Sequence, residues 1–184
     1  MRVGTFPVRT FGDPVLRQRA ADVEEIDGDL ARLADTMVAT MYDALGLGLA
    51  APQVGVLKRL YTYDLGAGPA TLVNPEIVDS HGTWSYDEGC LSIPDVHVEI
   101  IRPKVVTVRG LDLHGKEVVF EGDELMGRLI QHEIDHLDGI LMLDRIEPDQ
   151  RKSVLRDLRR AQFDDAGAAR VGVPSDARDS GRRL

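Results

Sequence analysis

Two stretches of the chain carry apolar residues at the spacing of one face of an α-helix. The first follows Asp29 and stops before Gly46, a residue type that commonly comes after a helix. Its apolar positions are Leu30, Leu33, Met37 and Met41. The second begins after Asp123, a good N-cap residue, and closes at Gly139. Its stripe runs through Leu125, Leu129, His132 and His136, so the pattern predicts a second helix that directs two histidines toward the core.

Between these helices, segments rich in β-branched and aromatic residues predict strands at residues 56–65, 70–79 and 102–122. Asp112 to Gly115 suit a hairpin loop inside the last segment. The connections look too short for helical crossovers, so we expect antiparallel pairing. The order of elements predicts an α+β fold in which antiparallel sheets pack around the central helix, with one helix before it and one after it.

The two ends of the chain have a different character. Residues 13–23 are punctuated by proline and predict an irregular arm across the surface. Pro148 is a good first-turn residue for a third helix, expected over residues 148–163, and residues 164–184 are rich in Asp, Gly, Ala and Arg. We therefore expect a catalytic domain over residues 1–147, a C-terminal helix of the same domain, and a flexible tail.

The composition limits where the protein works. Its 184 residues suffice for one domain, and they include one cysteine and five histidines. A single cysteine cannot form an internal disulfide, and the first residues lack the apolar core of a signal peptide. No stretch approaches the roughly 18 consecutive apolar residues of a membrane span. We therefore expect a cytoplasmic protein without a membrane partner.

The formal net charge of −9 is unevenly distributed. Residues 1–147 carry 13 Lys and Arg against 25 Asp and Glu, whereas residues 148–184 carry 9 against 6. Affinity for duplex DNA depends on clustered Lys and Arg, so the acidic body argues against a DNA partner. Only the C-terminal part has a net positive charge that favours binding to a polyanion.

The motif with the clearest chemistry is His-Glu-Ile-Asp-His at residues 132–136, on the second predicted helix. Histidines at i and i+4 lie one turn apart on one face and can share a metal ion, while Glu133 can reach a water at that ion. The alternative is a pair of core histidines beside a solvated glutamate, but buried imidazoles need partners. We expect a catalytic metal site, which needs a third protein ligand and one open position.

Two sources could supply the third ligand. Cys90 lies upstream within Glu-Gly-Cys-Leu-Ser at residues 88–92, and a thiolate with two histidines suits zinc or ferrous iron. Downstream carboxylates that could instead complete a metallopeptidase site are Asp144, Glu147, Asp149 and Asp157. One peptidase pattern continues to a third histidine, but Met142 stands at that position. Cys90 acting as a covalent nucleophile would leave the histidine spacing unexplained.

A third segment, Gly-Leu-Gly-Leu-Ala-Ala-Pro-Gln at residues 46–53, could simply be a helix end followed by a strand. It lacks the lysine of a phosphate loop and the spacing of a dinucleotide fingerprint. Its small residues allow the backbone of a ligand to approach closely, and Gln53 offers an amide donor.

Taken together, these segments resemble the three signatures of peptide deformylases, which remove the formyl group from N-formylmethionine at the start of new bacterial and organellar proteins. The signatures are Gly-x-Gly-x-Ala-Ala-x-Gln, Glu-Gly-Cys-x-Ser and Gln-His-Glu-x-Asp-His, at residues 46–53, 88–92 and 131–136. The resemblance covers roughly residues 3–147 and is to the active bacterial type. It implies a metal-dependent hydrolase that acts on N-formylmethionyl peptides and releases formate.

The resemblance also implies roles for matched residues. The implied metal ligands are Cys90, His132 and His136, with Fe²⁺ typical in the cell and Zn²⁺ or Ni²⁺ able to replace it. Glu133 would act as general base and then as general acid. The side-chain amide of Gln53 and the backbone N–H of Leu91 would face the developing oxyanion. Two other interpretations stay open, a metallopeptidase and an inactive metal-binding domain.

On the substrate side, the resemblance implies that Gly48 lets the substrate backbone pair with an edge of the protein. The apolar residues implied to receive the methionine side chain are Ile93, Leu129 and Ile130. His97 is either a substrate contact or a surface residue. The charged residues near the motifs are Glu88, Arg102 and Asp135, which either orient the ligands or form ordinary surface pairs.

The implied substrates emerge from ribosomes, which gives the basic segment 151–160 two interpretations. It is either a contact to ribosomal RNA or an ordinary solvated helix face.

Overall fold

The computed structural model describes residues 4–171, and the side chains up to residue 160. Its α-helices are α1 (Gly28–Asp43), α2 (Glu124–Leu137) and α3 (Pro148–Val171), and its short 3-10 helices are η1 (Pro14–Arg17), η2 (Ala51–Val54) and η3 (Met142–Asp144). Its strands are β1 (Gly48–Ala50), β2 (Leu60–Tyr63), β3 (Ala70–His81), β4 (Trp84–Cys90), β5 (Ile93–Arg102), β6 (Val105–Leu111) and β7 (Glu117–Asp123).

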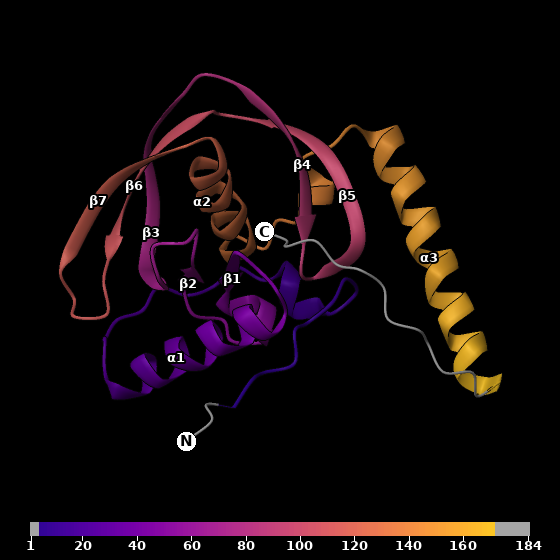
Figure 1. Ribbon diagram of the computed structural model, residues 1–184, viewed down its shortest axis with the longest axis horizontal. Helices are drawn as coiled ribbons and strands as arrows, with labels where there is room; N and C mark the ends of the chain where they lie inside the picture. Colours follow the sequence, from indigo (N-terminus) through magenta and orange to yellow (C-terminus); the bar gives the residue numbers. More distant parts are fainter. Residues whose placement is uncertain (1–3, 172–184) are drawn as a thin grey trace.

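The strands form two antiparallel sheets with α2 between them (Figure 1). One sheet has the order β1-β2-β3-β6-β7, and the other is the β4–β5 hairpin. Apolar side chains of α2 pack on the large sheet, while Arg128 and His136 of α2 contact β4 on the opposite side. The observed fold is therefore α+β, with antiparallel sheets around a central helix as the sequence predicts.

The long strand β3 carries the chain from one sheet to the other, arching over α2 before it turns into β4 (Figure 1). Its pairing with β6 shifts register at two places, between Val73 and Glu76 and between Ile77 and Asp79. Such irregularities bend a strand and increase its twist. The bend allows the β4–β5 hairpin to face α2 from the side opposite the large sheet.

Helix α1 covers the β1–β2 end of the large sheet. It begins at Gly28, one residue before the Asp29 start that the sequence suggests, because the carboxylate of Asp27 accepts a hydrogen bond from the N–H of Leu30 at 2.8 Å. Its buried side chains are Leu30, Ala34, Met37, Thr40 and Met41. Leu33 is only half-buried, so the contact face lies slightly to one side of the predicted stripe.

The β4–β5 hairpin is the element that the sequence pattern missed. The predicted strand at residues 102–122 contains β6, a turn and β7, but Arg102 is the last residue of β5. Pro103 follows Arg102 and interrupts the ladder, since proline lacks the backbone donor. Alternation along β5 places Val98 and Ile100 in the core and leaves Ile101 exposed.

The predicted hairpin turn and the second helix are confirmed. The turn lies between β6 and β7, where the N–H of Gly115 donates to the carbonyl of Asp112 at 3.0 Å. Helix α2 follows Asp123 and ends before Gly139, which adopts φ +73°.

The C-terminal helix α3 starts at Pro148 as predicted but continues to Val171 instead of ending at residue 163. Alanine is frequent over residues 161–171, and alanine is the best helix former. Of the tail predicted over residues 164–184, the part after residue 171 lies outside the described residues. Within residues 4–171, no helix is both long and apolar enough to cross a bilayer.

The arm over residues 13–23 is more ordered than predicted, because η1 forms within it and Asp13 accepts a hydrogen bond from the N–H of Val15 at 3.0 Å. The arm also joins α2 directly. The N–H of Ala20 donates to the carbonyl of Leu137 at 2.8 Å. Gly139 lies against the arm, where an added Cβ would come within 2.8 Å of the backbone of Arg17.

Gly139→Ala is expected to lower the free energy of unfolding by about 3 kcal/mol or more, because alanine meets both left-handed strain and a backbone collision. Gly115→Ala is the matched control, since Gly115 has nearly the same φ, +75°, and open space around its Cβ position. That variant should lose only about 1 kcal/mol. Urea unfolding at one fixed metal concentration measures both, and equal losses would show that the contact with the arm contributes nothing.

Candidate metal centre

Three ligand atoms converge where β4 meets α2. The thiol of Cys90 and ring nitrogens of His132 and His136 all lie within 4.8 Å of one another, and all three side chains are buried. The Sγ of Cys90 lies 3.2 Å from the Nε2 of His136. Within residues 4–160 this is the one group of three or more potential ligands that meets so closely. The structure thus brings together the three predicted metal ligands.

Local geometry accounts for this convergence. His132 and His136 are one turn apart on α2, and their rings meet edge to face with centroids 4.9 Å apart. Cys90 is the last residue of β4, where the pairing with β5 changes register between Gly89 and Cys90. A bulge re-aims the side chain that follows it. Cys90 is accordingly directed at the helix.

Glu88 orients the ring of His132 by binding its Nδ1. Its Oε2 lies 3.1 Å from the Nδ1 of His132, which directs the Nε2 of His132 toward Cys90. Arg102 donates to both carboxylate oxygens, at 2.7 and 3.0 Å, and Arg128 donates to Oε1 at 2.6 Å. Burial alone would raise the pKa of Glu88, but hydrogen bonds from His132 and Arg102 hold it well below its ordinary value. Glu88 is therefore a buried anion.

Asp135 extends the same network toward the C-terminal end of α2. Arg102 bridges Glu88 and Asp135, donating to Asp135 at 2.6 Å, and Arg145 also binds the Asp135 carboxylate. The predicted trio of Glu88, Arg102 and Asp135 is thus buried and connected, and is not a set of surface pairs.

A divalent cation fits this donor set. The Nε2 of His132 is buried and has no hydrogen-bond partner among the described residues, although its other nitrogen is bound to Glu88. Burial lowers the pKa of both imidazoles. At His132 the negative charges of Cys90 and Glu88 outweigh burial and raise the pKa, whereas His136 keeps a pKa well below its ordinary value. The pocket therefore favours positive charge between the thiolate and the histidines, and neutral histidine with thiolate suits zinc or iron.

Glu133 lies beside this set, at the edge strand β1. Its carboxylate is completely buried, and neither oxygen has a hydrogen-bond partner among the described residues. A Cβ added to Gly48 would lie 2.4 Å from Oε1 of Glu133, so only glycine leaves room for the carboxylate. Burial raises the pKa of Glu133 to about 7, with the charge of His132 opposing the shift. A carboxylate of this kind can both accept and donate a proton near neutral pH.

The side chain of Gln53 also lies close to Cys90. Its Oε1 accepts a hydrogen bond from the N–H of Ala50 at 2.8 Å, which turns its amide nitrogen toward Ser92 Oγ, at 3.2 Å, and Cys90 Sγ, at 3.8 Å. Leu91 follows Cys90 directly, so covalent geometry keeps its backbone N–H beside the same thiolate. Two amide donors thus flank Cys90.

The predicted substrate residues lie in three different environments. Gly48 belongs to β1, which stands at the end of the large sheet and leaves one backbone edge without a strand partner. Leu129 and Ile130 are fully buried in the cluster between α2 and the large sheet, and Ile93 is buried in the cluster that contains Cys90. His97 is exposed, and its ring covers Gly89, where an added Cβ would lie 2.7 Å from Nε2.

The downstream carboxylates are not near the histidines. Asp144 pairs with Arg17 and Arg151, and Asp149 pairs with Lys152. Neither Glu147 nor Asp157 joins the ligand group within the described residues. The metallopeptidase hypothesis therefore lacks its third ligand here.

Sequence reasoning missed Arg128. This residue is completely buried, lies under the ring of Trp84 at 5.4 Å from the ring centroid, and donates to the carbonyl of Trp84 at 2.6 Å. One signal was present in the sequence. Arg128 precedes His132 by four residues, so it occupies the same helix face as the ligands and needs a buried anion there.

Comparison with known proteins agrees with this geometry. The family model described as polypeptide deformylase matches residues 5–152. A peptide deformylase of Thermodesulfovibrio yellowstonii is 48% identical over 150 residues, covering 79% of this chain and 91% of that protein. The crystal structure of a peptide deformylase from Legionella pneumophila superposes with a TM-score of 0.83 at 40% identity, over 89% of this chain and 98% of that one.

A third relative carries a peptide. The Met-Ala-Ser-bound crystal structure of a class I type b peptide deformylase from Acinetobacter baumannii has a TM-score of 0.75 and 34% identity. The match covers 79% of this chain and all of that one.

Glu88→Gln is expected to weaken metal binding by about 10- to 100-fold, because a neutral amide holds His132 less firmly and leaves two arginines short of an anion. Competition with a chelator of known affinity measures the change. The matched control is Glu99→Gln, an exposed glutamate on β5 of the same hairpin that binds Ser85. A similar loss in both variants would contradict an orienting role for Glu88.

Proposed function

The chain belongs to the polypeptide deformylase family, and from this premise we propose which of its residues carry the reaction. Peptide deformylases are metal-dependent hydrolases that remove the formyl group from the N-terminal methionine of nascent polypeptides. The observation that carries the proposal is the buried set of Cys90, His132 and His136, with Glu133 packed against Gly48 beside it.

Cys90, His132 and His136 hold one divalent cation, Fe²⁺ in the cell, which Zn²⁺ or Ni²⁺ can replace. When bound, the cation supplies a Lewis acid that polarises the formyl oxygen and favours ionisation of water. The chemistry of the donor set supports the choice. One thiolate and two neutral histidines leave a divalent ion with a net charge of +1, so it stays a milder acid than one held by three histidines.

Glu133 moves the protons. Its buried carboxylate accepts a proton from the attacking water and donates it to the amine that departs as the C–N bond breaks, so the residue ends each turnover as it began. The pKa of about 7 supports both steps, since burial keeps the charged and neutral forms close in free energy.

The formyl oxygen gains negative charge during the attack, and Gln53 and Leu91 stabilise it. The amide nitrogen of Gln53 lies 3.8 Å from the Sγ of Cys90, and Leu91 directly follows Cys90 in the chain. One well-aimed donor of this kind stabilises a transition state by about 3 kcal/mol.

The free edge of β1 binds the peptide as an added strand beside Gly48. The proposed contacts of the methionine side chain are Leu129 and Ile130 on α2 and Ile93 in the separate cluster that contains Cys90. Exposed His97 is the proposed contact of the residues that follow. The Met-Ala-Ser peptide in the Acinetobacter baumannii structure has the composition of a deformylated product, which supports this substrate class. Exclusion of acyl groups larger than formyl follows from the tight packing of Glu133 on Gly48.

Glu133→Gln is expected to lower kcat on a formyl-Met peptide by about 10²- to 10⁴-fold while the metal content stays unchanged, because Glu133 moves protons and does not bind the ion. Formate release and free amine are measured with formyl-Met and acetyl-Met peptides. Glu124→Gln, at an exposed glutamate of the same helix, is the control and should be fully active.

Other outcomes of this assay identify other functions. Loss of the metal in Glu133→Gln would make Glu133 a ligand. Internal cleavage without formate release by the unmodified protein would indicate a metallopeptidase, and no turnover at all would indicate a binding domain.

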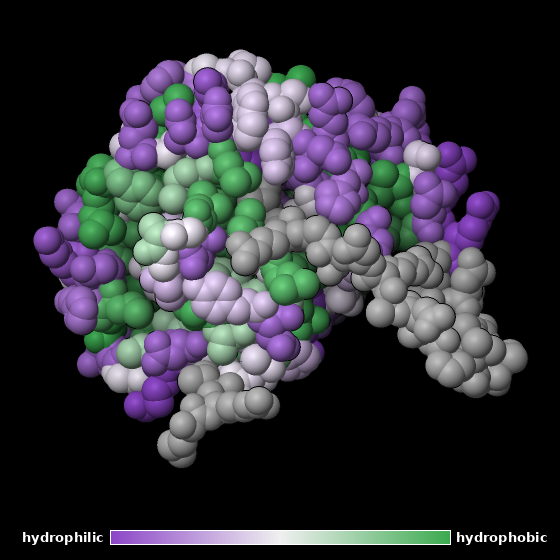
Figure 2. Space-filling view, in the orientation of Figure 1, coloured by the Kyte–Doolittle hydropathy of each residue, from purple (hydrophilic) through white to green (hydrophobic). Residues whose placement is uncertain are grey.

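Nascent-chain substrates support a cytoplasmic location at the ribosome, and in this proposal α3 contacts ribosomal RNA. Its described surface is largely hydrophilic, and its axis leads away from the catalytic body (Figures 1 and 2). The exposed arginines of this helix are Arg156, Arg159 and Arg160. Arginines spaced along a helix neutralise phosphates, and such binding weakens steeply with salt.

Charge reversal of Arg156, Arg159 and Arg160 to glutamate is expected to weaken salt-dependent ribosome binding at least about tenfold, with unchanged turnover of a short formyl-Met peptide. Cosedimentation with ribosomes over a salt series measures the binding. The control reverses three exposed arginines of the body, Arg19, Arg32 and Arg109. An equal loss of ribosome binding in both triple variants would mean that net charge accounts for the effect. It would show that α3 is not the contact.

A further inference from the structure

The segment before η1 makes two backbone hydrogen bonds to the catalytic centre. The N–H of Arg9 donates to the carbonyl of Gln53 at 2.7 Å, and the N–H of Phe11 donates to the carbonyl of Ser92 at 2.8 Å. Gln53 carries one proposed oxyanion donor, and Ser92 directly follows Leu91, which carries the other. One accepting carbonyl therefore belongs to the residue that carries an oxyanion donor, and the other belongs to the residue directly after the second donor.

These acceptors belong to separate parts of the fold. Gln53 lies in η2, directly after edge strand β1 of the large sheet, whereas Ser92 lies in the turn of the β4–β5 hairpin. Strands β1 and β4 are in different sheets and share no strand pairing. Residues 9–11 thus join the two sheets across the site, and across this join the amide of Gln53 donates to the Ser92 hydroxyl at 3.2 Å.

With the Arg9 bond, Gln53 is fixed at both of its carbonyl groups. Arg9 holds the main-chain oxygen, and the N–H of Ala50 holds the side-chain oxygen at 2.8 Å. The amide nitrogen is the remaining polar end of the residue, and it is aimed at Cys90. A shift of the main chain of Gln53 would move this nitrogen with it.

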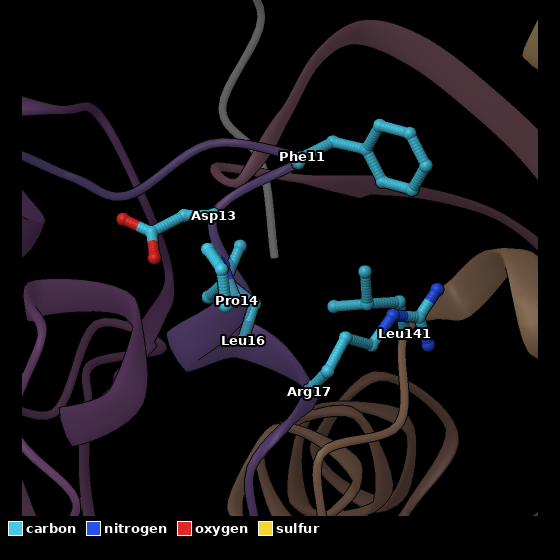
Figure 3. A pocket seen from close by; sticks show the side chains of 7 residues that line it. Phe11, Asp13, Pro14, Leu16, Arg17 and Leu141 are labelled. Atoms are coloured by element: carbon cyan, nitrogen blue, oxygen red, sulfur yellow. The ribbon is translucent and has the colours of Figure 1, made fainter.

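The segment is itself fixed on both sides of these bonds. Before them, the N–H of Phe6 donates to the hydroxyl of Thr40 on α1 at 3.0 Å. After them, Asp13 caps η1, and Arg17 of η1 pairs with Asp144. Figure 3 shows Phe11 and Leu141 at a cavity of about 120 Å³, and the side chain of Phe11 also packs against the apolar cluster that contains Cys90. The main-chain bonds act together with these contacts to position the segment.

We propose that Arg9 and Phe11 are positioning residues for deformylation: their backbone N–H groups hold the donors of Gln53 and Leu91 at the spacing that the developing oxyanion requires. The inference rests on the proposed role of Gln53 and Leu91. Small displacements of aimed donors lower rates strongly, and about 1 Å of misplacement can reduce a rate by about 10²-fold. Cys90, His132 and His136 are on β4 and α2 and take part in neither bond, so we expect loss of a bond to displace the donors more than the metal ligands.

Single backbone esters test the proposal. Replacing Arg9 or Phe11 in the full chain by the corresponding α-hydroxy acid removes one N–H and leaves the side chain intact. Each ester is expected to lower kcat on a formyl-Met peptide by about 10- to 100-fold, with KM within about twofold and with unchanged affinity for Ni²⁺. The control is the ester at Thr10, whose N–H has no hydrogen-bond partner among the described residues.

A double substitution separates positioning from general damage. In the Gln53→Ala background the Arg9 ester should cause no further loss of kcat, because the donor that it positions is already gone. The Phe11 ester should still lower kcat there, since it acts through Leu91. A purely structural lesion at residue 9 would instead lower kcat in both backgrounds.

The outcomes distinguish this inference from the proposed function. If Gln53→Ala itself leaves kcat unchanged, the oxyanion role of Gln53 is wrong. If Gln53→Ala lowers kcat by about 10² or more while the Arg9 and Phe11 esters behave like the Thr10 ester, the positioning role is wrong. Loss of Ni²⁺ affinity in parallel with kcat would also overturn it.

Discussion

The hydrogen bonds of the buried Glu88 carboxylate are the interactions on which the rest of the structure depends. The carboxylate joins β4 to β5 through Arg102 and to α2 through Arg128 and His132, so one anion connects the hairpin to the central helix. Two buried guanidinium groups are tolerable because this carboxylate and Asp135 compensate their charge. The same carboxylate fixes which nitrogen of His132 faces the thiolate. Fold and ligand geometry therefore share a single electrostatic constraint.

The proposed catalytic centre lies where separate pieces of the fold meet. Helix α2 supplies the histidines and Glu133, the hairpin supplies Cys90 and Leu91, and the segment after β1 supplies Gln53. The apolar clusters overlap these pieces, since Cys90 and Leu91 of the hairpin belong to different clusters, and polar contacts join the pieces at the site. Precision at the centre consequently depends on hydrogen bonds between the pieces, while overall stability depends on the clusters. Substitutions in the two classes should have separable effects.

The sequence predicted what is local. Helix α2, its histidine spacing and its glycine end all follow from residues within one or two turns, and the structure confirms them. The β4–β5 hairpin was missed although Val98 and Ile100 alternate with polar residues along β5. The reason is that the buried positions nearest the site carry Glu88, Cys90 and Arg102, whose polar or small side chains give no apolar signal. The bonds of Arg9 and Phe11 were also missed, since long-range main-chain contacts leave no periodic signal, whereas Arg128 was missed although its spacing from His132 was visible.

The short length of β1 limits when the enzyme can act on a new chain. Three residues offer a ladder of only about 10 Å, so a peptide added at this edge is held over its first few residues and no further. Such an edge cannot distinguish one protein from another by the body of its sequence, and it cannot engage a terminus already built into a folded domain. An enzyme with this edge is general across many chains, and its opportunity closes when the terminus of each chain becomes buried.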